Sequence, residues 1–272
     1  MNIAIVGATG NVGRKTLEVL ESKNFPIKEL YLVASPRSVG QKVVYKDKEY
    51  EVFNLETFDF SKVQITFFAA GGKISENYAE KVAKHSIVID NSSFFRMDPD
   101  VPLIVPQVNA EAVKTMKKNI IANPNCSTAQ LVIALKPLHD LFEIERIVVS
   151  TYQSVSGGGR ASMDELIEQT QLFLENKSIK SKNFTKQIAF NAIPQIDVFA
   201  DDGYTNEELK MTNETKKILD NNIELTATCV RIPVLVSHAE SVNIQFKKSF
   251  TLEKVNEALN KADGCEVYDS RE

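Results

Sequence analysis

Residues 2–13 read NIAIVGATGNVG, and this stretch decides the expected fold. Residues 2–6 form a short apolar run that is typical of a buried strand, and three closely spaced glycines follow it. Apolar residues then recur at helical spacing up to about residue 23, and residues 29–34 read as a second strand. The order strand, glycine turn, helix, strand predicts a βαβ unit with parallel strands.

The glycine turn has the composition of a phosphate-binding site. Gly7, Gly10 and Gly13 lack a Cβ, so the backbone can turn tightly and approach a pyrophosphate, and the helix N-terminus offers unpaired N–H groups. The spacing is G-x-x-G-x-x-G rather than G-x-G-x-x-G. A tight turn without a ligand therefore stays open as the alternative interpretation.

The segment after the second strand bears on which dinucleotide would bind. An NAD site usually has an acidic residue there, which binds the ribose 2′-hydroxyl. Residues 34–40 (ASPRSVG) contain no acid, but they contain Ser35, Arg37 and Ser38. Two hydroxyls and an arginine suit a 2′-phosphate and favour NADP over NAD, the alternative being an exposed loop with an incidental arginine.

Up to about Pro124 the expected elements continue to alternate. We expect a hairpin over 43–53, strands over 63–70, 86–90 and 119–122, and helices over 75–85 (with Ser75 as its N-cap) and 109–118. This alternation predicts a doubly wound, mostly parallel sheet, that is, an α/β Rossmann-like domain over residues 1–125.

Beyond Pro124 the expected strands become longer and regular crossovers become fewer. We expect helices over 126–141, 161–175, 205–221 and 252–262, strands over 144–155, 223–236 and 241–247, and a polar loop over 177–186. This pattern predicts an α+β second domain over residues 126–272.

The composition of the 272 residues excludes several classes of protein. The formal net charge is -4 without a basic stripe, which argues against a nucleic-acid binder. No apolar run approaches the roughly 18 residues that span a bilayer, and no signal peptide is visible. The three cysteines lie far apart and form neither a disulfide framework nor a zinc ribbon. We therefore expect a cytoplasmic protein with no membrane segment and no metal site.

Cys126 and His238 are the candidates for nucleophilic chemistry. Cys126 stands where a helix is expected to begin, and a helix N-terminus lowers a thiol pKa and makes a nucleophile. A buried core cysteine explains the position of Cys126 equally well, and for Cys229, within an apolar strand, it is the better explanation. His238 follows a strand and is the best partner of the three histidines, although a loop histidine is more often structural. Arg231 could bind a carboxylate bidentately.

Four charged residues share one face of the helix expected over 205–221. They are Glu207, Lys210, Glu214 and Lys217. Their spacing alone favours a solvated, charge-paired face.

Taken together, these segments resemble the aspartate-β-semialdehyde dehydrogenases. The resemblance is carried by residues 7–13, 34–40, 91–96, 123–129, 150–159, 190–199, 207–217 and 229–241. It implies an enzyme that reduces 4-phospho-L-aspartate to L-aspartate 4-semialdehyde with NADPH and releases phosphate. It also implies a homodimer that serves diaminopimelate, lysine, threonine, methionine and isoleucine biosynthesis.

The resemblance implies a role for each residue of the site. Cys126 would form a thioacyl intermediate, and His238 would be the general acid/base. Gln153 would position the intermediate, Arg231 would bind the substrate α-carboxylate, and Glu207 would lie near the amino group. Arg96, Lys210 and Asn125 would hold phosphate. The implied nucleotide-binding residues are Gly7, Thr9, Gly10, Asn11, Val12, Gly13, Ser35, Arg37, Ser38, Gly71, Gly72, Ser156 and Gly157.

Two alternatives stay open. The resemblance implies that family members usually continue past residue 272, with further strands and a final helix. A truncated or inactive homologue that keeps nucleotide binding or dimerisation is therefore one alternative. A different acyl-phosphate reductase on the same scaffold is the other.

Overall fold

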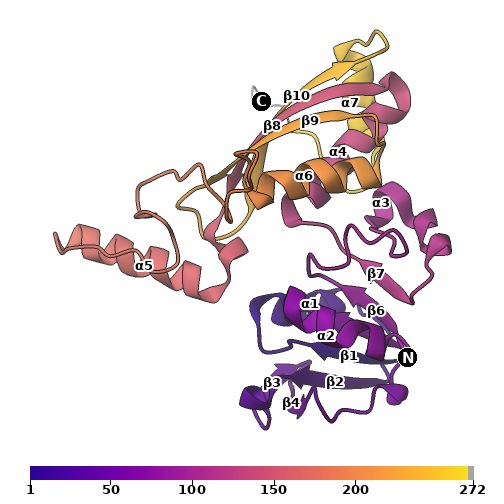
Figure 1. Cartoon of the computed structure of the whole chain (residues 1–272), viewed down its shortest axis with the longest axis vertical. Coiled ribbons are helices and arrows are strands. Elements are labelled where there is room, and N and C mark those ends of the chain that lie inside the picture. Colours follow the sequence, from indigo (N-terminus) through magenta and orange to yellow (C-terminus); the bar gives the residue numbers. More distant parts are fainter. Residues whose placement is uncertain (269–272) are drawn as a thin grey trace. The chain divides into compact units, whose positions relative to one another are not determined.

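The chain forms two compact units in a computed structural model that describes residues 1–268 (Figure 1). Unit 1 comprises Met1–Ile104 and Ala110–Pro124, and unit 2 comprises Val105–Asn109 and the chain from Asn125 onward. Within residues 1–268, no helix combines the length and the apolar character needed to cross a membrane.

Unit 1 is built on a seven-stranded sheet of order β3-β4-β2-β1-β5-β6-β7. Its strands are β1 (Asn2–Val6), β2 (Glu29–Ala34), β3 (Lys42–Tyr45), β4 (Lys48–Asn54), β5 (Ile65–Phe68), β6 (Ile87–Asp90) and β7 (Ile120–Ala122). All neighbouring strands are parallel except the β3–β4 hairpin. The expected doubly wound, mostly parallel sheet is thus confirmed.

The βαβ unit that opens the chain forms as its apolar pattern predicts. Ile3 and Ile5 of β1 are fully buried and share a core with Leu17 and Leu20 of helix α1 (Asn11–Ser22). Since Leu17 and Leu20 are three positions apart, they lie on one face of α1. Burial of this face against the sheet places the N-terminus of α1 directly after the glycine turn that ends β1.

Two glycines of this turn are required by the fold itself. Gly7 has a φ of 87°, and a Cβ on it would lie 2.6 Å from the carbonyl oxygen of Ala69. A Cβ on Gly13 would lie 2.3 Å from the carbonyl oxygen of Gly7. Gly7 and Gly13 are therefore required by the packing of the turn, whatever the turn binds.

The substitution Gly13→Ala should lower the free energy of unfolding by about 3 kcal/mol, because the backbone must move to admit the methyl group. Urea unfolding followed by circular dichroism measures this loss. Gly72→Ala is the matched control, since a Cβ at Gly72 would meet only side-chain atoms at 3.9 Å or more. Equal stabilities of the two variants would contradict the close approach between Gly13 and Gly7.

Two of the helices expected before Pro124 differ from the structure. Helix α2 (Gly72–Val82) begins earlier than expected because Gly71, with a φ of 85°, is its N-cap. Ser75 is therefore not the N-cap: it lies inside the helix, buried, and donates to Asp90 Oδ1 at 2.8 Å. The helix expected over 109–118 is instead the short helix α3 (Pro106–Asn109) followed by a 3-10 helix, Ala110–Thr115. The Asn109 side chain accepts from the backbone N–H of Val105 at 2.9 Å, which closes this short helical turn.

Unit 2 has a three-stranded sheet of order β10-β8-β9. Its elements are α4 (Cys126–Phe142), β8 (Ile144–Gln153), α5 (Arg160–Leu174), α6 (Asn206–Ile218), β9 (Glu224–Arg231), β10 (His238–Phe246) and α7 (Leu252–Lys261). β8 is antiparallel to β10 and parallel to β9. The second domain is therefore the expected mixture of helices and sheet.

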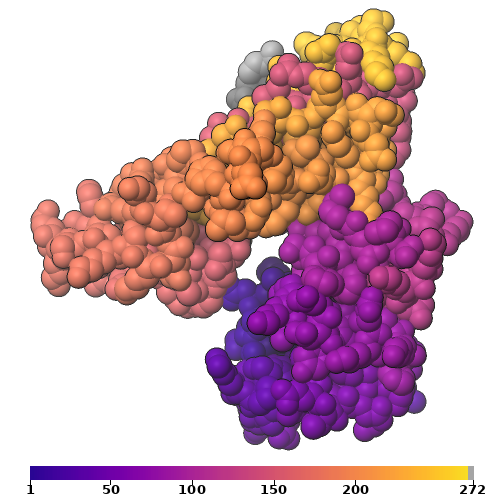
Figure 2. All heavy atoms as spheres, viewed as in Figure 1, coloured from indigo at the N-terminus to yellow at the C-terminus, as the bar shows by residue number. Residues whose placement is uncertain are grey.

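The core of unit 2 lies between this sheet and helices α4 and α6. Ile147 and Val149 of β8 share one apolar cluster with Leu135 of α4 and Met211 of α6. Cys229 of β9 belongs to the same cluster, which confirms that it packs in the core. Helix α5 and the following segment project from the rest of unit 2 as an arm, drawn in salmon in Figure 2.

The strand boundaries near the end of the chain correct the expected ones. β9 ends at Arg231 rather than at residue 236, because Pro233 has no N–H to donate to a ladder. β10 begins at His238 rather than at residue 241. His238 is therefore the first residue of a strand and not a loop residue.

Candidate active site

Cys126 is the first residue of α4, and its position is fixed by the cap of that helix. Asn125 is the N-cap, and its Oδ1 accepts from the backbone N–H of Ser127 at 2.9 Å. The backbone N–H of Asn125 donates to Glu214 Oε2 at 2.6 Å. Glu214 is almost fully buried on α6, so the cap is bound to a second helix. The turn that carries the Cys126 thiol is thus held by two hydrogen bonds, one within the cap of α4 and one to Glu214 of α6.

The structure brings Cys126 and His238 together. The distance from Cys126 Sγ to His238 Nε2 is 3.2 Å. The backbone N–H of Ser154 donates to His238 Nδ1 at 3.0 Å. Because a backbone N–H can only donate, Nδ1 must be unprotonated, and the neutral imidazole carries its proton on Nε2. His238 therefore presents an N–H to the sulfur of Cys126.

The charge states of this pair differ in part from those expected. Burial lowers the pKa of His238 below its ordinary value, and Arg231 adds to this effect, so the neutral imidazole is favoured. The pKa of the Cys126 thiol is raised, first by desolvation and then by the Glu207 carboxylate, although the N–H groups of the helix N-terminus oppose this. The expected lowering of the thiol pKa is therefore wrong for the substrate-free protein. The desolvation cost and the nearby carboxylate outweigh the helix terminus.

Three of the expected residues lie side by side across the sheet of unit 2. Gln153 of β8 pairs with His238 of β10 on one side and with Arg231 of β9 on the other. Residues that pair across strands point to the same face of a sheet. The acid/base, positioning and carboxylate-binding candidates therefore form one row.

Glu207 is the hub of the hydrogen bonds in this site. It lies in the first turn of α6, which begins with a capping box of Thr205 and Glu208. Its Oε1 accepts from Asn125 Nδ2 at 2.9 Å and from Gln153 Nε2 at 3.0 Å. Burial acts to raise the pKa of Glu207, but bonds from Gln153, Lys210 and Asn125 hold it below its ordinary value. Glu207 is therefore a buried carboxylate that is kept charged.

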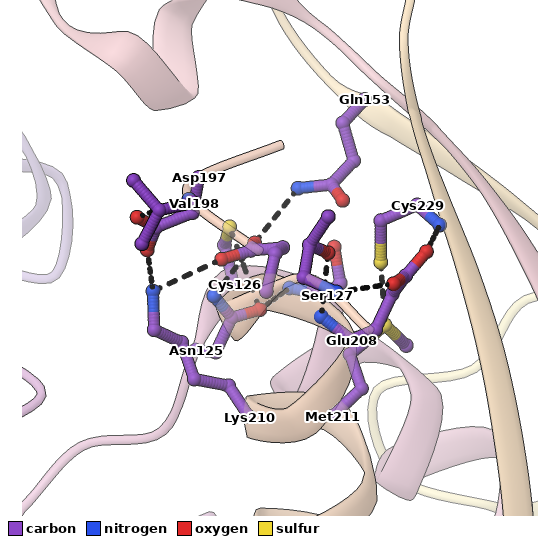
Figure 3. Close-up of polar contacts among 12 residues, drawn as sticks. Asn125, Cys126, Ser127, Gln153, Asp197, Val198, Glu208, Lys210, Met211 and Cys229 are labelled. Atoms are coloured by element: carbon purple, nitrogen blue, oxygen red, sulfur yellow. Dashed lines mark hydrogen bonds and ion pairs between the residues drawn. The ribbon is translucent and has the colours of Figure 1, made fainter. Parts of the chain in front are cut away.

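Lys210 supplies a cation to the site. Its Nζ lies 2.8 Å from Asp197 Oδ2 and 3.3 Å from Glu207 Oε2, and Figure 3 shows Lys210 extended toward Asp197. Burial acts to lower the pKa of Lys210, but the two carboxylates raise it above its ordinary value.

The solvated charged face suggested by the spacing is wrong for Glu207 and Glu214, because these side chains are only 6% and 1% exposed.

Arg231 is buried beside the 3-10 helix Val155–Gly158. Its Nη1 donates to the carbonyl oxygen of Ser154 at 2.6 Å. A Cβ on Gly157 would lie 2.9 Å from the same nitrogen, so a glycine lets the guanidinium approach the backbone. The Ser156 hydroxyl lies 2.9 Å from that of Ser154. Ser156 and Gly157, expected to contact the nucleotide, thus belong to the surroundings of Arg231 and His238 in unit 2.

Unit 1 contains a cavity of about 280 Å³ at the carboxyl ends of its central strands. The lining residues are Val6, Gly7, Thr9, Gly10, Ala34, Ser35, Ser38, Leu55, Ala69, Ala70 and Ile74. Five of these are expected nucleotide-binding residues. Gly10 is the N-cap of α1, so the unpaired N–H groups of that helix begin at this cavity. The residues present fit the pyrophosphate of a dinucleotide.

The other expected residues of unit 1 lie around this cavity or apart from it. Asn11 and Val12 open α1, and Gly71 and Gly72 open α2 directly after the lining residues Ala69 and Ala70. Arg37 lies exposed in the 3-10 helix Pro36–Ser38. Arg96 is buried, and its guanidinium donates to the carbonyl oxygens of Asn123 and Asn91.

Several residues of the site were not expected from the sequence. Asp197 holds Lys210, Thr151 Oγ1 donates to Gln153 Oε1 at 2.9 Å, and Ser154 sets the tautomer of His238. Gln130 Nε2 donates to Glu240 Oε1 at 2.7 Å beside the Cys126–His238 pair. The alternation of Thr151 and Gln153 along a strand is the one signal that could have identified a member of this group.

Known families match both halves of the chain. Residues 2–116 match the family described as semialdehyde dehydrogenase, NAD binding domain. Residues 135–272 match the family described as semialdehyde dehydrogenase, dimerisation domain.

Individual relatives agree with these matches. An aspartate-semialdehyde dehydrogenase of Aquifex aeolicus is 53% identical over 273 residues, which cover 98% of this chain and 80% of the relative. An aspartate-semialdehyde dehydrogenase of Helicobacter pylori is 45% identical over 280 residues, which cover 98% of this chain and 81% of the relative. The crystal structure of aspartate semialdehyde dehydrogenase II from Vibrio cholerae superimposes with a TM-score of 0.96 at 50% identity, covering 98% of this chain and 81% of that one. On this evidence the chain belongs to the aspartate-semialdehyde dehydrogenase family of oxidoreductases.

Proposed function

We propose that this chain reduces 4-phospho-L-aspartate to L-aspartate 4-semialdehyde with NADPH, through a thioacyl intermediate on Cys126. The observation that carries the proposal is the 3.2 Å contact between Cys126 Sγ and His238 Nε2 at the N-terminus of a 17-residue helix. A thiol in this position can attack an acyl phosphate, and the helix N-terminus offers N–H groups to the oxyanion that forms. The structure of a Vibrio cholerae relative described as complexed with ASA supports the same substrate class.

The first half-reaction uses the residues of unit 2. Cys126 Sγ attacks the carbonyl carbon of the acyl phosphate, a C–S bond forms and the C–O bond to phosphate breaks. The thiol proton leaves with the phosphate, which departs as hydrogen phosphate. His238 assists by donating its Nε2–H to the sulfur as the thiol loses its proton, which stabilises the thiolate that attacks and is the role that its tautomer permits.

The second half-reaction returns the enzyme to its starting state. NADPH, when bound, supplies a hydride to the carbonyl carbon of the thioester. The C–S bond then breaks as the aldehyde forms, and the sulfur leaves as a thiolate. His238 again donates to the sulfur, which takes up a proton before the next cycle. The sum consumes the acyl phosphate, NADPH and one proton, and it yields the aldehyde, NADP and hydrogen phosphate.

Charged and polar residues of the chain would hold the two ends of the substrate. We assign the substrate α-carboxylate to Arg231, because a guanidinium forms bidentate bonds with carboxylates. Glu207, a charged carboxylate beside Gln153, would bind the α-ammonium group. Lys210, Arg96 and Asn125 would hold the phosphate. The Asp197 carboxylate that now contacts Lys210 would then share this cation with the substrate.

The cofactor is assigned to the cavity of unit 1. Gly7, Thr9 and Gly10 would contact the pyrophosphate, and Ser35, Arg37 and Ser38 would contact the 2′-phosphate of NADP. The absence of an acidic residue from residues 34–40 favours NADP over NAD. The description of residues 135–272 as a dimerisation domain supports a homodimer. We place the reaction in cytoplasmic biosynthesis of lysine, threonine, methionine and isoleucine, and we propose a domain boundary near Asn125.

A direct assay in the reverse direction tests the proposed function. The purified chain is mixed with aspartate semialdehyde, inorganic phosphate and NADP or NAD, and reduction of the nucleotide is followed. We expect reduction that requires phosphate and is faster with NADP. A folded chain that reduces neither nucleotide would support an inactive homologue, whereas activity with another aldehyde only would support a different acyl-phosphate reductase.

The substitution Arg231→Leu should raise the KM for aspartate semialdehyde about 30-fold and leave the KM for phosphate nearly unchanged. The reason is the loss of a charged hydrogen bond worth about 2 kcal/mol to the α-carboxylate. Steady-state kinetics give both constants. Arg231→Lys keeps the charge and should raise the KM less. An unchanged KM for the aldehyde in a folded Arg231→Leu protein would refute the assignment of the carboxylate to Arg231.

A further inference from the structure

Helix α4 and strand β10 are joined by two polar contacts that lie one step apart. Cys126 and Gln130 are four residues apart on α4, and His238 and Glu240 are two residues apart on β10. Four residues of helix rise about 6 Å and two residues of strand rise about 6.6 Å, so the two pairs match in spacing. Cys126 Sγ contacts His238 Nε2 at 3.2 Å, and Gln130 Nε2 donates to Glu240 Oε1 at 2.7 Å.

The two ends of β10 are held against α4 in different ways. At the far end, the rings of Phe246 and Phe142 lie 5.4 Å apart within an apolar cluster. Among residues 1–268, the backbone of β10 pairs with β8 alone, so β10 is an edge strand of the sheet described. At the near end, Val242 is 37% exposed and His238 and Glu240 are half-buried. The Gln130–Glu240 hydrogen bond is thus a side-chain contact next to the Cys126–His238 pair that joins this end of β10 to the helix.

We propose that Gln130 and Glu240 are a positioning pair, whose hydrogen bond keeps His238 Nε2 within reach of Cys126 Sγ. The inference rests on the function proposed above, and it adds residues to which no role in the reaction has been assigned so far. Neither residue needs to touch the substrate. Gln130 acts through Cys126, four residues earlier on α4, and Glu240 acts through His238, two residues earlier on β10.

The role requires an acceptor oxygen on Glu240 rather than a negative charge. Burial raises the pKa of Glu240 to about 7, although the bond from Gln130 opposes this. The carboxyl group is therefore partly protonated near neutral pH. In the ionised form either carboxylate oxygen of Glu240 can accept the hydrogen bond from Gln130 Nε2. In the protonated form the carbonyl oxygen still accepts it. An amide at position 240 should consequently serve nearly as well as the carboxyl group.

Alanine variants of the pair, measured with a double variant, test this inference. Gln130→Ala and Glu240→Ala should each lower kcat about ten-fold with little change in KM, because a small displacement of the acid/base group slows chemistry more than binding. The kcat of the double variant should be no lower than that of the less active single variant, because each single substitution already breaks the same hydrogen bond. Glu240→Gln should retain nearly full kcat.

The alkylation rate of Cys126 by iodoacetamide, located by peptide mass mapping, gives a readout without substrate. Gln130→Ala and Glu240→Ala should change this rate. Glu240→Gln should have nearly the same rate as the unaltered protein. Gln245→Ala is the matched control, because Gln245 Nε2 donates to Glu145 Oε2 at 2.7 Å toward the other end of the same strand. This control should match the unaltered protein. Gln130→Met, which keeps the side-chain length and removes the donor, replaces Gln130→Ala if the alanine variant does not fold.

Three results would overturn the inference: unchanged kcat and alkylation in the single variants, multiplicative losses of kcat in the double variant, or an equal loss in Gln245→Ala. A failure of the proposed function looks different. In that case the unaltered protein is inactive, while the alkylation rates of the variants still report on the Cys126–His238 pair.

Discussion

Cys126→Ala is expected to lower the kcat for aspartate semialdehyde by about four orders of magnitude or more, without loss of folded protein. The thiol is the group that forms and breaks the bond to the substrate carbon, and no other residue of the site can replace it. Cys126 is exposed at the start of α4, although neighbouring groups partly desolvate its thiol, so removal of its sulfur leaves no cavity in the core. Nucleotide reduction measured with the unaltered protein and the variant gives the ratio.

Cys265→Ala is the control for this substitution. Cys265 is also partly accessible, but its Sγ contacts only the backbone carbonyl oxygen of Ile133 among the contacts described, at 3.9 Å. It should leave kcat unchanged. Substantial activity in Cys126→Ala would contradict covalent catalysis at this residue, and a large loss in Cys265→Ala would show that the assay responds to thiols in general.

His238→Ala is expected to lower kcat by about two to four orders of magnitude, because proton transfer and hydrogen bonding at the sulfur are lost. His85→Ala, an exposed histidine of unit 1, should leave kcat unchanged. The pH profile adds a second test. Burial lowers the pKa of His238 from 6.5, so the neutral imidazole persists below that pH. Protonation of Nδ1 would break the hydrogen bond from the Ser154 backbone N–H that orients the ring, so the acidic limb of kcat/KM should lie below pH 6.5. A limb that lies above pH 6.5 and disappears in His238→Ala would contradict the neutral tautomer fixed by Ser154.

Local sequence patterns were sufficient to predict the fold because they coincide with its local physics. The apolar run of β1, the glycine turn and the face of α1 each depend on neighbours within a few residues. Local patterns predicted wrong helix boundaries where the sequence is compatible with more than one backbone geometry. The boundary of α2 depended on the positive φ of Gly71, and the helix expected over 109–118 is instead the short helix α3 followed by a 3-10 helix.

The candidate site could be predicted only in part. The position of Cys126 after Pro124 indicates a helix terminus, but its raised pKa depends on Glu207, which is 81 positions away in the sequence and lies close only in the fold. The charged residues of α6 followed a spacing that also suits a solvated face. Their burial depends on α4 and the sheet, which the spacing of one helix does not encode.

The pairing of the strands accounts for the rest of the site. Arg231, Gln153 and His238 come together because β9, β8 and β10 pair in one register. A shift of one residue in either pairing would point one of these side chains to the opposite face of the sheet. A single sequence does not specify that register, and for this reason Ser154, Thr151 and Glu240 were not expected as members of the site.

Intact-protein mass spectrometry tests most directly the central claim that Cys126 is acylated during the reaction. The chain is incubated with 4-phospho-L-aspartate in the absence of NADPH, quenched in acid and weighed, and the modified peptide is sequenced. We predict one aspartyl group per chain, attached to the peptide that contains Cys126, lost on addition of NADPH and absent from Cys126→Ala. An unmodified chain that nevertheless turns over when NADPH is added, or an aspartyl group attached to any other residue, would contradict the claim.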